Sequence, residues 1–125
     1  MGSIRRKTFT KPLPLADFRE AVRIDPDCGD AHNDLAWLCA TCPDGKLRDG
    51  KAAVEHAETA CELTDWKDPW YFGTLAAAYA ELGNFDEAVK WEKKAIESPD
   101  YPRDALEEAR AQLKLYEQRK PFREQ

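Results

Sequence analysis

The sequence predicts an all-α fold built from repeated pairs of helices, and three observations lead to this prediction. Alanine, glutamate, lysine and leucine dominate the chain of 125 residues, whereas the β-branched residues that favour strands are few. Ala88 and Ala95 lie seven residues apart, which is nearly two helical turns and places both on one helix face. Ala53 and Ala60 have the same spacing 35 residues earlier, so the pattern repeats along the chain.

Residues 1–14 are predicted to form a basic, mobile N-terminal arm. They contain Arg5, Arg6, Lys7 and Lys11 and no acidic residue, and the rest of the chain has a formal net charge of −9, from 15 basic and 24 acidic residues. The whole chain has a net charge of −5, so its bulk charge does not support binding to nucleic acid. We therefore expect no nucleic acid among its partners.

The repeats follow this arm in order. Residues 15–28 are predicted to form one helix, the second half of an incomplete repeat. Residues 29–68 contain the first complete helical pair, with a turn insertion at 43–50. Residues 69–102 contain the second pair, which Gly83 divides into two helices.

A last amphipathic helix is predicted over residues 103–119, and a tail follows at 120–125. The apolar side of this helix is formed by Leu106, Ala109, Leu113 and Tyr116.

The two complete pairs agree in length, spacing and turn. The residues that carry this agreement are Leu75, Ala76, Tyr79, Gly83, Phe85, Ala88 and Ala95 in the second pair, and Leu35, Ala36, Ala53, Ala60 and Leu63 in the first. On these residues the chain resembles the tetratricopeptide repeat (TPR) family over about residues 15–118. The resemblance implies a short right-handed α-solenoid with a C-terminal capping helix, in which alanines allow close approach of the helices.

The resemblance also implies a concave groove lined by the first helix of each pair. The groove candidates are Asn33, Asp34, Trp37, Trp70, Thr74, Ala77 and Glu81, with Asp30, Thr41 and Gly73 on the same faces. These positions include no lysine or arginine, which argues against the clamp for a terminal carboxylate found in some members of the family. The groove instead suits a ligand with an apolar anchor and positive charge. The alternative for Trp37 and Trp70 is packing against neighbouring helices.

The cysteines and histidines provide no convincing reactive site. Cys39-Ala-Thr-Cys42 has redox spacing but lies at a helix end with no strand before it. Cys28 and His32 would complete a set of four zinc ligands, but one helix would place Cys28 and Cys42 about 20 Å apart. We therefore predict no catalytic residue, no metal site and no cofactor.

These observations predict a non-enzymatic protein–protein interaction module that binds a peptide or a partner helix. An alternative is a structural or self-associating segment of a larger protein, with homodimers formed through the incomplete N-terminal repeat. A third is a metal- or redox-responsive protein that uses Cys39 and Cys42. No apolar run reaches the roughly 18 residues of a membrane span, so we expect no membrane partner and a cytoplasmic location.

Overall fold

The computed structural model describes residues 15–124 and confirms the all-α prediction, because these residues contain six α-helices and no strand. The helices are α1 (Leu15–Ile24), α2 (Gly29–Thr41), α3 (Gly50–Leu63), α4 (Pro69–Leu82), α5 (Phe85–Glu97) and α6 (Leu106–Glu117), and a 3₁₀-helix (Arg103–Ala105) precedes α6. The predicted arm at 1–14 and the last residue of the predicted tail lie outside the described residues.

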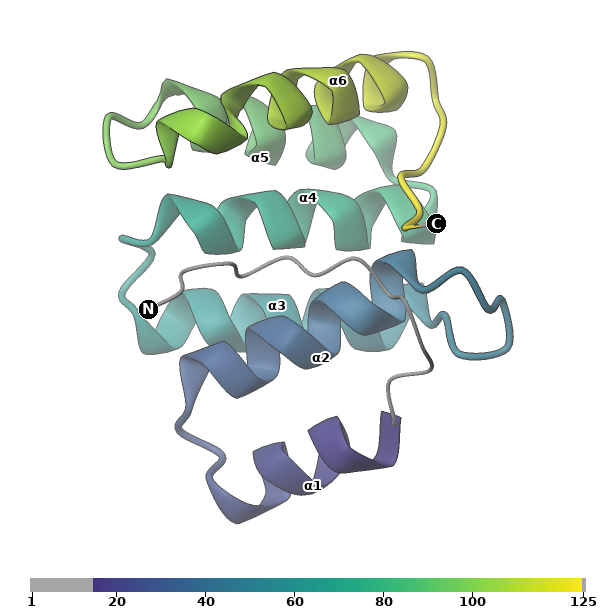
Figure 1. Ribbon diagram of the computed structural model, residues 1–125, viewed down its shortest axis with the longest axis vertical. Helices are drawn as coiled ribbons and strands as arrows, with labels where there is room; N and C mark the ends of the chain where they lie inside the picture. The colour runs from purple at the N-terminus through teal and green to yellow at the C-terminus, as the bar shows by residue number, and fades with distance from the viewer. Residues whose placement is uncertain (1–14, 125) are drawn as a thin grey trace.

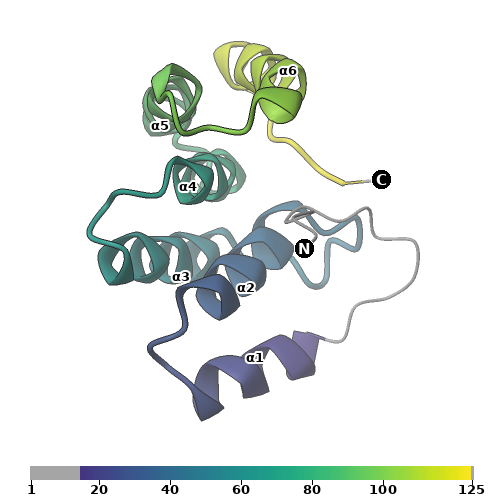
Figure 2. The same cartoon turned by 60° about the vertical axis from the view of Figure 1, so that its left-hand side comes forward.

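Each helix packs against the next one along the chain (Figures 1 and 2). In addition, α2 lies along α4, so the first helix of one predicted pair contacts the first helix of the next. Helix α6 packs mainly on α5. The linker between α3 and α4 lies on the opposite side of the molecule from the chain's C-terminal end in both views.

Three helices begin at side chains that cap their first turn. The side chains of Asp49, Asp68 and Asn84 accept hydrogen bonds from backbone N–H groups of α3, α4 and α5 at 3.1, 2.9 and 3.3 Å. Gly83 ends α4 in the left-handed region, with φ of +93°. These residues define the helix boundaries locally.

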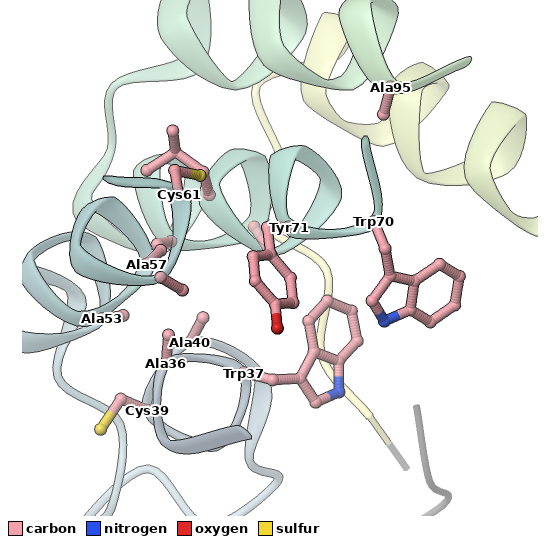
Figure 3. Packing of buried hydrophobic residues seen from close by; sticks show 14 of the residues in the cluster. Ala36, Trp37, Cys39, Ala40, Ala53, Ala57, Cys61, Trp70, Tyr71 and Ala95 are labelled. Carbon is pink, nitrogen blue, oxygen red and sulfur yellow. The ribbon is translucent and has the colours of Figure 1, made fainter. Parts of the chain in front are cut away.

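Alanines form the contact between α2 and α3. Figure 3 shows Ala36 and Ala40 of α2 opposite Ala53 and Ala57 of α3, and all four are completely buried. The two predicted alanine pairs, one in α3 and one in α5, are also completely buried. Small side chains allow helix backbones to approach closely, so this interface leaves little room for a larger residue.

Gly50, which the sequence places in the turn insertion, is the first residue of α3. A Cβ atom at this position would lie 2.9 Å from both the backbone nitrogen and the Cα atom of Leu82 at the end of α4. The insertion is therefore held against α4 at a point where only glycine fits.

We expect Gly50→Ala to destabilise the fold by about 1–2 kcal/mol, because two backbones must separate to admit the methyl group. Urea unfolding measures this change. Gly45→Ala is the matched control, because its Cβ would meet only the end of the Arg48 side chain, at 3.0 Å. Equal stability of the two variants would contradict the close contact.

Candidate functional site

The C-terminal segment, residues 118–124, returns from α6 to the ends of α2 and α4 (Figure 2). Arg119 adopts a left-handed conformation with φ of +64°, and the backbone N–H of Lys120 donates to the carbonyl of Leu115 at 2.9 Å. This turn reverses the chain after α6. Residues 120–124 then continue without regular secondary structure.

Trp37 is the residue of α2 whose side chain contacts this segment. Its indole N–H donates to Glu124 Oε2 at 3.0 Å, and its ring centroid lies 5.9 Å from that of Phe122. The backbone N–H of Glu124 donates to the carbonyl of Thr41 at 2.8 Å. The last carbonyls of a helix lack partners within the helix, so this bond satisfies one of them.

Glu81, in the last turn of α4, carries the ionic part of the contact. Arg123 Nη2 lies 3.0 Å from Glu81 Oε1, and Arg48 Nε lies 3.4 Å from Glu81 Oε2. Only 14% of the Glu81 side chain is exposed, so water screens these pairs less than it screens fully exposed ones. We call Trp37, Thr41 and Glu81 the docking face.

Asn33 and Thr74 lie one helical turn from the two tryptophans, Asn33 before Trp37 and Thr74 after Trp70. Both are buried, with 4% and 1% of their surface exposed. Asn33 Oδ1 and Thr74 Oγ1 accept no hydrogen bond from the described part of the chain. Two buried acceptors therefore lie on the same helix faces as the tryptophans.

The remaining groove candidates occupy different environments. Trp70 is buried, and its ring lies 5.7 Å from that of Tyr101. Figure 3 shows Trp37 and Trp70 projecting from α2 and α4 beside Tyr71. Ala77 is buried in α4, and Asp34 is half-buried. Both tryptophans thus pack within the folded chain. Of the candidates, Trp37 and Glu81 contact the C-terminal segment.

The structure also shows the surroundings of the three other residues on the predicted groove faces. Thr41 is completely buried, and its hydroxyl donates to the carbonyl of Trp37 at 2.7 Å. Gly73 is buried in α4. Asp30 is exposed and accepts a hydrogen bond from the Tyr71 hydroxyl, which joins α2 to α4.

Sequence reasoning did not identify Phe122, Arg123 or Glu124, because the tail carries no periodic pattern. The available signal was an aromatic residue directly after a proline, at 121–122, in an otherwise charged segment. The sequence analysis also did not identify two buried polar residues. Glu92 is completely buried on α5, and Gln112 is buried on the apolar side of α6.

The environment of Cys39 disfavours thiolate chemistry. Burial, followed by the negative charge of Asp49, raises the pKa of the Cys39 thiol. Burial also raises the pKa of Cys61 to about 12. All four cysteines are free, and residues 15–124 contain no group of three or more His, Cys, Asp or Glu residues that could hold a metal ion.

His32 and His56 form a pair between α2 and α3. Their Nδ1 atoms are 3.1 Å apart, and His32 Nε2 lies 2.8 Å from the carbonyl oxygen of Pro26. A carbonyl can only accept, so His32 carries its proton on Nε2 and accepts at Nδ1 from the N–H of His56. The pair thus shares a single proton between its Nδ1 atoms and links the loop after α1 to α3.

We expect the free energy of unfolding to fall as the pH falls below about 6.5, the ordinary pKa of histidine. Burial lowers the pKa of His56, with a further contribution from His32, so the unfolded chain binds more protons in this range. The loss should level off below the lowered pKa. His56→Gln should give a flatter dependence of stability between pH 7 and 5 in chemical unfolding, and an unchanged slope would contradict this assignment.

Comparison with protein-family models, with curated proteins and with solved structures found no match to this chain. Among residues 15–124, no helix is both long and apolar enough to cross a membrane.

Proposed function

We propose that this chain is a non-enzymatic protein-interaction module that binds an extended peptide segment on the faces of α2 and α4. The observation that carries the proposal is the C-terminal segment, which already lies on the docking face as a non-helical stretch. Its contacts combine a ring contact, an ion pair and a backbone hydrogen bond. These are the interactions by which extended peptides are recognised.

The charge of the site supports a ligand with positive charge. Glu81 binds two arginines from different parts of the chain. Asp34, a half-buried groove candidate on α2, adds a second carboxylate on the neighbouring helix. The side-chain oxygens of Asn33 and Thr74 lie on the same helix faces, and they would provide further acceptors for the N–H groups of a longer peptide.

A phage-displayed library of random octapeptides, selected on the full chain, tests this proposal. We expect the enriched peptides to contain an aromatic and a basic residue. Their site can be located by NMR on the ¹⁵N-labelled chain, with the tryptophan indole signals assigned through single Trp→Phe variants. The Trp37 indole signal should shift when an enriched peptide is added.

Trp66 provides the control within the same spectrum. It lies in the linker between α3 and α4, is 39% exposed and stacks on Trp91, with ring centroids 5.4 Å apart. This linker lies on the opposite side from the C-terminal end (Figures 1 and 2). Failure to enrich any peptide, or shifts that centre on Trp66, would overturn the proposal.

Self-association through α1 is the second candidate function. Helix α1 contains no fully buried residue, and 68% of Ile24 at its end is exposed. A second copy stacked on this helix would cover that surface. Sedimentation of the wild-type chain and of the Ile24→Glu variant tests this function. Concentration-dependent dimers that the substitution removes would support self-association, and a monomer at all concentrations would refute it.

A further inference from the structure

We propose that Phe122 and Arg123 act as an intramolecular ligand of the docking face, in competition with a partner segment that has an aromatic residue directly followed by arginine. This inference rests on the proposed function and specifies the class of its ligand. In cis, the C-terminal segment would keep the face closed until such a partner is present.

The contacts of the segment separate into a general part and a selective part. The bond from the Glu124 N–H to the Thr41 carbonyl involves only backbone atoms, so any extended peptide could form it. The ring of Phe122 on Trp37 and the pairing of Arg123 with Glu81 depend on side chains. The Trp37 indole N–H also donates to the Glu124 carboxylate, but any acceptor group at that place could receive this bond. Selectivity between side chains therefore resides mainly in residues 122 and 123.

The order of these two residues follows from the two helices they contact. Successive side chains of an extended chain point in opposite directions. Phe122 reaches Trp37 on α2, and its neighbour Arg123 reaches Glu81 on α4. An aromatic residue followed directly by arginine thus spans both helices, whereas an acidic residue in the second place would be repelled by Glu81.

The segment is held weakly enough to be displaced. Phe122 is only half-buried, and the Arg123 side chain is 43% exposed. Water reaches the Arg123 side of its ion pair with Glu81, so this pair contributes only modestly to the binding of the segment. The covalent connection through α6 offsets this weak binding, because a short linker gives a tethered ligand an effective concentration of about millimolar. A partner in trans must therefore compete with the tethered segment.

A fluorescein-labelled peptide with the sequence of residues 118–124 tests the inference by fluorescence anisotropy. It is titrated into the full wild-type chain and into the full-length Phe122→Ala/Arg123→Ala variant. We expect the variant to bind at least about tenfold more tightly, because a face occupied nine-tenths of the time reduces the apparent affinity in that proportion. Circular dichroism and thermal unfolding establish that the variant is folded.

Two controls separate competition from other effects. Lys120→Ala changes an exposed side chain of the same segment and should bind the peptide as the wild type does. A peptide in which alanine replaces its phenylalanine and second arginine should bind neither chain.

Three results would overturn the inference. Equal affinity of the wild type and the double variant would show that the segment does not compete. Binding of library-selected peptides at Trp37, without binding of the 118–124 peptide to the double variant, would refute the aromatic–arginine class and leave the proposed function intact. Wild-type dimers that the double substitution abolishes would place the segment on a second copy.

Discussion

Tyr116→Ala is expected to cause the largest loss of stability, about 3–5 kcal/mol, the range found when a large buried aromatic is truncated. Among residues 15–124, Tyr116 is the largest side chain with no exposed surface. Its ring extends from α6 into a cluster with Ala76 and Ala80 of α4 and Ala88 of α5. The fully buried neighbours are alanines, which cannot extend into the space, and the larger side chains packed against the cluster, such as Phe85 and Leu115, are only half-buried. We therefore expect the cavity to remain partly open.

Equilibrium unfolding in urea measures this effect, and two variants bracket it. Tyr116→Phe keeps the ring and should retain most of the stability, whereas Lys114→Ala on the exposed side of the same helix should change it by less than about 0.5 kcal/mol. Because the C-terminal segment follows α6, Tyr116→Ala should also loosen the contacts of Phe122 and Trp37. A loss below 1 kcal/mol would show that the ring does not anchor α6.

Ala57→Leu is expected to destabilise the fold by about 3 kcal/mol, the upper part of the usual range for overpacking. Ala57 is completely buried on α3, opposite Ala36 and Ala40 of α2 (Figure 3). Three added carbon atoms must enter an interface that has small side chains on both sides. The backbones of α2 and α3 would have to separate, which also disturbs the His32–His56 pair between the same helices.

Ala111→Leu is the matched control, because it makes the same change at an exposed position of α6. Leucine and alanine differ little in helix propensity, so this control should be nearly neutral. The midpoint of thermal unfolding distinguishes the two variants. If both melt at the same temperature, the α2–α3 contact is not tight and the role assigned to the buried alanines is wrong.

The elements of the fold were predictable where the signal is local. Helix stripes, the alanine pairs and capping residues such as Asp68 and Asn84 involve residues within one or two turns of each other, so they can be recognised in the sequence. Gly83 likewise indicates the end of a helix through its own backbone freedom. The stacking of these helices as a TPR-like solenoid stays a prediction.

The candidate site was only partly predictable. Trp37 and Glu81 were expected on a ligand-binding face, and both contact the C-terminal segment. The partners of these two residues were not expected. Trp37 and Glu124 are 87 residues apart, and Glu81 and Arg123 are 42 apart. No periodicity within a helix indicates such a pairing.

The sequence by itself determined the helical class, most helix ends and the small residues at helix contacts, because these depend on propensity, periodicity and capping over a few neighbouring positions. Only the tertiary structure decided that the tail returns to α2 and α4, that His32 meets His56, and that Glu92 is buried. The reason is physical: these contacts depend on where distant helices lie in space, and that position follows from the packing of the whole chain.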